Sequence, residues 1–274
     1  MSILNTVLGG LVDALLYPFR GLPPLVGLVV VSVLTSMAML LVFRATSNQK
    51  GIEAVKRRIA AGVFEIRLFN DDPRAILRAQ ADILRHTMTY LGLTMVPVLW
   101  MMVPLVLLII QLEFRYGYAG LEPGGTALVK VTVTAASASA APEISLDTDA
   151  GIEVESPLLW IPSLREANWR IAARDLGDHE LRVRIGDEVF AKRVRVTDAV
   201  VRRAPVRPSK RILDQLLNPA ERPLPAGAPV ESITVTYPHA TIGVLWWEAH
   251  WIVVFFILTI VIAYVLQRPF KVTL

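Results

Sequence analysis

The chain contains no cysteine, which excludes a disulfide framework, a thiolate metal site and a cysteine nucleophile. Its four histidines, His86, His179, His239 and His250, are scattered and form no pair at metal-ligand spacing. The sequence also lacks a phosphate-binding glycine loop and the G-x-S-x-G motif of serine hydrolases. It therefore predicts no enzymatic activity, no cofactor and no metal site.

Charge is scarce as well. Charged residues make up 19% of the chain and hydrophobic residues 54%, and the mean hydropathy of +0.50 is too high for a soluble globular protein. A bilayer core about 30 Å thick is crossed by roughly 20 apolar residues in a helix, because lipid offers the backbone no hydrogen bonds. The sequence predicts a membrane α-helical protein with transmembrane helices at 23–44, 87–113 and 242–267. Near the start of the third span, Trp246, Trp247 and Trp251 are expected to form an interfacial belt.

The loops predict the orientation of these spans. Residues 44–85 carry nine Lys/Arg and five Asp/Glu, so the positive-inside rule places this loop in the cytoplasm. Residues 113–243 carry 16 Lys/Arg and 17 Asp/Glu and are expected outside. The chain is thus predicted in a bacterial inner (plasma) membrane, with the N-terminus outside and the tail 268–274 in the cytoplasm. The pI of about 9.5 follows from this topology signal, and nucleic acid is not expected as a partner.

Helical periodicity predicts two structures next to the spans. Residues 1–22 are expected to form an amphipathic helix lying in the outer interface, the alternative being a frayed apolar tail. Residues 45–86 are expected to form a cytoplasmic helical hairpin that turns at 70–73, where Pro73 opens the second helix. Nothing between Pro73 and Gly92 stops a helix, so this second helix should continue into the second span.

Residues 122–240 are predicted to form an extracytoplasmic Ig-like β-sandwich. Alternating apolar and polar residues recur between turn signals, as in 181–185, while a short helix is expected at 209–217 and a flexible loop at 137–142. An acidic run in this domain either binds calcium or, as the alternation favours, forms the solvated face of a strand. It comprises Asp147, Asp149, Glu153 and Glu155.

The spans themselves carry polar side chains. Ser32, Thr35, Ser36 and Met39 share one helical face that leads to Arg44. A polar stripe in a bilayer faces protein or water, and Thr94 and Gln111 of the second span are candidates for the opposite wall. Pro97 and Pro104 predict kinks in that span. Taken alone, Arg44 is equally compatible with a snorkelling anchor at the cytoplasmic interface.

Together these features resemble the YidC/Oxa-type insertase superfamily. The resemblance rests on the span that ends at 40–44, the hairpin that begins at 47–50 and turns at 70–74, and the proline-bearing span segment 96–104. It covers about residues 1–115 and, loosely, 240–274. The layout is most similar to that of three-span members, including archaeal proteins and the insertase subunit of the eukaryotic ER membrane complex.

The resemblance implies a hydrophilic groove open to lipid and cytoplasm, with Arg44 as its positive residue and Ser32, Thr35 and Ser36 in its walls. It also implies a hairpin that captures client proteins or ribosomes. The basic residues of this hairpin are Lys56, Arg57, Arg58, Arg74 and Arg78. The expected function is then insertion or assembly of membrane proteins, with the lipid bilayer and client membrane proteins, or other membrane subunits, as partners.

A different class of function is also compatible with the sequence. The chain would then be a membrane-anchored adaptor whose periplasmic β-domain binds an envelope partner. Its basic segment 202–207 would carry that contact, and the spans would serve only as an anchor.

Overall fold

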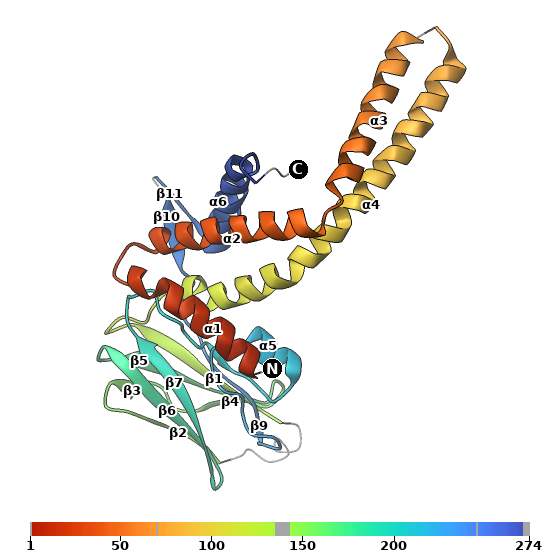
Figure 1. The fold of residues 1–274 in the computed structure, drawn as a ribbon. Coiled ribbons are helices and arrows are strands. Elements are labelled where there is room, and N and C mark those ends of the chain that lie inside the picture. Colours follow the sequence, from red (N-terminus) through yellow and green to blue (C-terminus); the bar gives the residue numbers. More distant parts are fainter. Residues whose placement is uncertain (1, 70, 135–142, 245, 271–274) are drawn as a thin grey trace. The chain divides into compact units, whose positions relative to one another are not determined.

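The computed structural model describes residues 2–69, 71–134, 143–244 and 246–270. The chain divides into two compact units (Figure 1). The β-unit contains Met1–Gly27 and Leu108–Val254, and the helical unit contains Leu28–Leu107 and Phe255–Leu274. The loop expected at 137–142 lies outside the described residues, as do Asn70 of the expected turn and the last four residues of the expected tail.

Two helices are long and apolar enough to cross a membrane, and they indicate membrane association. The first is α2 (Pro24–Thr46), and the second contains α4 (Pro73–Leu112), with mean hydropathies of 2.6 and 2.5 in their most apolar segments. As predicted, α4 runs without interruption from the hairpin into the apolar segment. Pro97 and Pro104 lie inside α4, where each removes a backbone hydrogen bond, and Figure 1 shows that this helix changes direction along its length.

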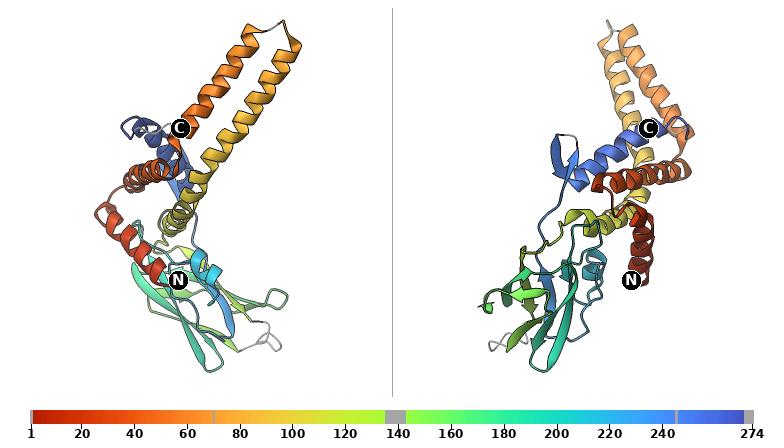
Figure 2. Two further views of the ribbon diagram at one scale, coloured as in Figure 1. Left: turned by 45° about the vertical axis from the view of Figure 1, so that its right-hand side comes forward. Right: turned by 90° about the vertical axis from the view of Figure 1, so that its left-hand side faces the viewer.

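An antiparallel hairpin of α3 (Gln49–Leu68) and the first half of α4 extends from the helical unit (Figure 2). The helix α3 begins where the Asn48 side chain accepts a hydrogen bond from the backbone N–H of Gly51. Ile52, Val55 and Gly62 form its buried face. Gly62 permits close approach of α4, because a Cβ atom there would lie 2.7 Å from Cγ1 of Ile83.

The prediction of a helix over 242–267 is wrong for about the first third of that range. Residues expected to be helical form an antiparallel hairpin of β10 (Thr241–Val244) and β11 (Trp247–His250), and α6 (Trp251–Leu266) begins only after it. With 16 residues, α6 is about 24 Å long and shorter than a typical bilayer core. A continuous apolar run does not by itself distinguish a strand from a helix, and the extended span rested on such a run.

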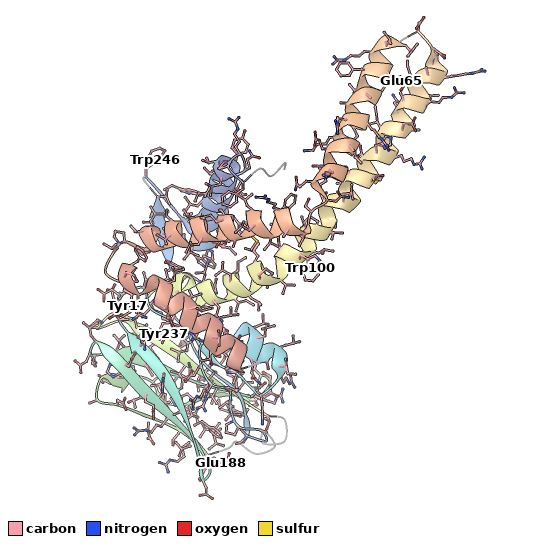
Figure 3. The ribbon with its side chains drawn as sticks, in the orientation of Figure 1. Tyr17, Glu65, Trp100, Glu188, Tyr237 and Trp246 are labelled. Carbon is pink, nitrogen blue, oxygen red and sulfur yellow. The ribbon has the colours of Figure 1, made fainter. Side chains whose placement is uncertain are left out.

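The expected tryptophan belt is corrected at one position. The Trp251 side chain is fully buried and its Nε1 donates to Oε2 of Glu113 at 2.9 Å. Trp246, labelled in Figure 3, is 91% exposed, and Trp247 is also exposed. Trp251 is therefore a packing residue of the β-unit, while Trp246 and Trp247 are exposed.

Besides the β10–β11 hairpin, the β-unit contains two antiparallel sheets that share one core. The first has the strand order β3-β5-β1-β9-β8, with β4 also paired to β5, and the second has the order β2-β6-β7. Val129, Val131, Ile171, Leu181 and Val183 are among the side chains of this core, and the alternating burial of β1 matches the alternation in its sequence. The strands are β1 (Thr126–Val133), β2 (Ile144–Thr148), β3 (Ile152–Val154), β4 (Leu159–Ile161), β5 (Glu166–Ala173), β6 (Gly177–Ile185), β7 (Glu188–Val196), β8 (Val206–Arg207) and β9 (Val230–Val235).

Two further helices belong to the β-unit. The N-terminal helix α1 (Ser2–Leu16) buries Val12 and Leu16, and α5 (Ile212–Leu217) is the short helix expected near 209–217. The sequence predicted an amphipathic helix within residues 1–22, and α1 forms there, in one compact unit with the β-sheets. A π-helical turn, Glu113–Gly117, follows α4 and leads into the sheets.

The acidic run of the β-unit pairs with arginines across neighbouring strands. Asp147 lies 3.6 Å from Arg184, Asp149 lies 3.8 Å from Arg182, and Glu153 pairs with Arg174. These carboxylates thus have cationic partners on the solvated surface of the sheets, as the alternation favoured.

Candidate functional site

The polar residues predicted to share one face of α2 do lie on one face of the helix, but that face is buried. Ser32 and Ser36 are 0% exposed and Thr35 is nearly buried, together with Val31 and Leu40 on the same side of the helix. Spacings of three and four residues place these side chains in one stripe. The structure therefore puts the hydroxyls at a helix contact and not on the wall of an open groove.

This face contacts α6 through Ser36. The Ser36 hydroxyl lies 3.0 Å from the backbone oxygen of Thr259 and 2.7 Å from that of Ser32, so its one proton is shared between two carbonyl acceptors. The Ser32 hydroxyl is buried and has no hydrogen-bond partner among the described residues. We call the contact formed by Ser32, Ser36 and Thr259 the α2–α6 seam.

Three other predicted members of the site lie on α2 and α4. Met39 is half-buried on α2, and Arg44 is exposed two residues before the end of the helix. Thr94 is half-buried on α4, where its hydroxyl donates to the carbonyl of Tyr90 at 3.0 Å. Leu40 and Phe43 close the end of the bundle by packing with Met101, Leu266 and Phe270.

Gln111 belongs to the β-unit and not to the unit that holds Ser32. Its side chain is buried, and its backbone oxygen accepts a hydrogen bond from Nη1 of Arg115. Nη2 of Arg115 also donates to the carbonyl of Gly9 at 3.0 Å and to Asp13 at 2.8 Å. Gln111 therefore takes part in holding α1 at the end of α4, a structural role that its position in the apolar run did not indicate.

The basic residues of the hairpin are largely solvated. Nζ of Lys56 lies 5.6 Å from the centre of the Tyr90 ring, and Arg57 lies 4.0 Å from Glu53 on the same helix. The remaining predicted members are all exposed, and these are Arg58, Arg74 and Arg78. The hairpin thus presents a cationic surface with few neutralising partners among the described residues.

An apolar surface that was not predicted lies near the tip of the same hairpin. Phe64, Leu68, Phe69 and Leu77 are exposed, with fractions between 46% and 75%. They lie between the cationic residues Arg67, Arg74 and Arg78. The sequence could have predicted this surface, because Phe64 and Leu68 do not fall on the face of α3 that buries Ile52 and Val55. Exposed apolar side chains beside cations are typical of a surface that contacts another chain or a membrane.

Buried arginines organise the connection between α4 and the sheets. Arg203 is buried and donates to the carbonyls of Tyr118, Thr197 and Ala199 at 2.8 to 3.0 Å. Burial lowers the pKa of Arg203 from its ordinary value. Its guanidinium thus serves three carbonyl groups of the connecting loops, and the predicted adaptor segment 202–207 contains structural residues as well as surface ones.

A second buried cation lies on β7. Nζ of Lys192 donates to the carbonyl of Ala204 and to Glu221, and the lysine side chain is 0% exposed. Burial lowers the pKa of Lys192, against the opposing effect of the Glu221 carboxylate. Together with the hydrogen bond from Arg202 to the carbonyl of Pro219, this pair fixes residues 202–221, including α5, to the sheet.

Within the described residues, no three side chains of histidine, aspartate or glutamate gather in a way that could hold a metal ion. The comparisons with known proteins place the chain in no group: no family model, no curated protein and no solved structure matches it.

Proposed function

We propose that the protein is an insertase-like membrane protein that aids insertion or assembly of other membrane proteins. The observation that carries the proposal is the α2–α6 seam, a polar helix contact with an unpartnered Ser32 hydroxyl, in the same small unit as a cationic and apolar hairpin. The resemblance to the YidC/Oxa-type superfamily supports the same function. Its partners would be the lipid bilayer and client membrane proteins, with the hairpin and the C-terminal tail in the cytoplasm.

The α2–α6 seam has the physical properties of a helix contact that a client segment could replace. A buried hydroxyl without a partner costs about 1–3 kcal/mol, so the closed seam is less stable than an apolar contact of the same shape. A client segment entering between α2 and α6 would offer Ser32 and Ser36 new polar partners. The site then acts without covalent chemistry, because it lowers the cost of moving a polar segment through lipid, which is about 2.5–3.5 kcal/mol per charged residue.

The hairpin would bind the client before it reaches the α2–α6 seam. A nascent transmembrane segment is apolar and is often flanked by charge, and the hairpin tip exposes both kinds of complementary surface. Phe64, Leu68 and Leu77 would contact the apolar segment, while Arg74 and Arg78 would hold acidic flanks.

Replacing Arg44 by Glu tests the proposal. Arg44 is exposed at the end of the helix that carries the seam, and in this model of function its charge draws acidic client tails toward it. Reversing the charge should lower insertion of an acidic-tailed client into proteoliposomes by roughly tenfold, which corresponds to about 1.4 kcal/mol of electrostatic energy. Insertion is measured by protease protection of the translocated tail.

Arg193→Glu is the matched control, because Arg193 is exposed on β7 in the other unit. It should leave insertion unchanged. Equal insertion by the wild-type protein, Arg44→Glu and protein-free liposomes would refute the proposal and leave the adaptor function as the better account.

A further inference from the structure

The β-unit carries a second apolar helix that the proposed insertase function does not use. The side chains of Ile212, Leu213 and Leu217 on α5 are 64%, 70% and 56% exposed. They follow directly after Lys210 and Arg211, which are also exposed. Exposed leucine and isoleucine beside lysine and arginine on a short helix are typical of segments that lie in a membrane interface.

The helix α5 lies beside α1. Nδ2 of Asn5 donates to the carbonyl of Gln215 at 2.8 Å, and Figures 1 and 2 show the two helices next to each other in the β-unit. On α1, Val7 and Leu11 are exposed while Val12 and Leu16 are buried. Both helices therefore present apolar side chains to their surroundings. We call Val7, Leu11, Ile212, Leu213 and Leu217 the helix platform.

The position of α1 relates the helix platform to the membrane. Arg115 follows α4 directly and binds Asp13 and the carbonyl of Gly9, so α1 is held against the end of the helix that contains the second candidate span. At its other end α1 is followed, after a short connection, by α2, the first candidate span. The helix platform thus belongs to the same unit as the residues at which the two candidate spans begin and end, 24–27 and 108–112.

Hydrogen bonds on both sides of α5 hold this helix in place. Lys192 binds both Ala204 and Glu221 and thereby fixes the segment before and after α5 to β7. The Ser209 hydroxyl donates to Asp214 at 2.6 Å and stabilises the first turn of α5. Lys210 and Arg211 have no ion-pair partner among the described residues, so their charges remain available to an external anion.

We infer that α5 is a second interfacial helix, and that the helix platform docks the β-unit on the outer surface of a membrane containing anionic lipid. The apolar side chains enter the headgroup boundary, and Lys210 and Arg211 contact phosphate groups. Interfacial placement of α1 alone would leave Leu213 and Leu217 in water. The inference rests on the proposed membrane placement of α2 and α4 but not on insertase activity.

The test uses the full chain in lipid nanodiscs, where the absence of native cysteine permits a single fluorescent label. Leu213→Cys carries an environment-sensitive nitrobenzoxadiazole probe, and Val189→Cys, at an exposed apolar site on β7, is the matched control. The neighbouring Glu188 is labelled in Figure 3, in the part of the sheets remote from α5. The discs contain phosphatidylcholine with or without phosphatidylglycerol, and a lipid with a nitroxide near its headgroup serves as quencher.

The probe at 213 should shift to shorter wavelength and be quenched in discs that contain phosphatidylglycerol, while the probe at 189 should show neither effect. Adding Lys210→Gln and Arg211→Gln should lower the docking equilibrium about fivefold for each charge removed. Equal quenching at 213 and 189 in both kinds of disc would overturn the inference. So would protection of position 213 that appears in native membranes but not in lipid discs, since that result would assign the helix platform to a protein partner.

Discussion

Locking α2 to α6 should abolish client insertion. In the double variant Ser36→Cys/Thr259→Cys, the two cysteines replace the residues whose hydroxyl oxygen (Ser36) and backbone oxygen (Thr259) lie 3.0 Å apart in the α2–α6 seam. Joining them by oxidation or by a short bifunctional thiol reagent removes the opening that the proposal requires. Insertion into proteoliposomes should fall to the level of protein-free liposomes, and a reducing agent should restore it.

Two controls separate the lock from simple damage. The double variant kept reduced, and each single variant treated with oxidant, should insert clients well above the level of protein-free liposomes, because their helices stay free to separate and cysteine is close to serine and threonine in volume. If the cross-linked protein inserts clients as fast as the reduced protein, the α2–α6 seam does not open during function. The proposal that client segments enter between α2 and α6 would then be wrong.

The largest effect on stability is expected at the buried pair of Lys192 and Glu221. Glu221→Gln leaves the ammonium group of Lys192 buried without a counter-charge, and breaking a buried pair in this way typically costs about 3–5 kcal/mol. Domains of this size have about 5–15 kcal/mol of stability, so much of the stability of the β-unit would be lost. Urea unfolding of the full chain in detergent, followed by tryptophan fluorescence, to which the buried Trp169 of the β-unit contributes, measures the change.

Glu166→Gln is the matched control for this prediction. Glu166 pairs with Lys130 at 3.4 Å, but the lysine side chain there is 42% exposed, and such surface pairs contribute about 0–1 kcal/mol. The account predicts a clear difference between the two variants. Equal unfolding midpoints for Glu221→Gln and Glu166→Gln would show that the Lys192 pair does not stabilise the β-unit as argued.

The sequence predicted those elements whose cause is local. The apolar composition of α2 and α4 identified both helices, the turn at 70–73 with Pro73 located the hairpin, and alternation located strands such as β1 and β6. In each case the signal lies within a few residues of the element itself. The same holds for the polar face of α2, since helical spacing alone placed Ser32, Thr35 and Ser36 together.

Features that depend on distant contacts were not predictable in the same way. The apolar run 242–250 forms β10 and β11, although its composition is compatible with a helix. Gln111 was assigned to a groove wall, but its backbone oxygen accepts a hydrogen bond from Arg115. Arg115 in turn binds α1, which lies about 100 residues away in the sequence. The contact of Ser36 with Thr259 likewise joins residues 223 positions apart, and it has no sequence signature.

Site-specific cross-linking of a client tests the central claim most directly. A photoreactive amino acid is placed at Ser36, on the buried polar face of α2, or at Leu34, which is 44% exposed on another face of the same helix. The account predicts that a membrane-inserting client is captured from position 36 during insertion and much less from position 34. Capture from position 34 alone, or from neither position while insertion proceeds, would contradict it.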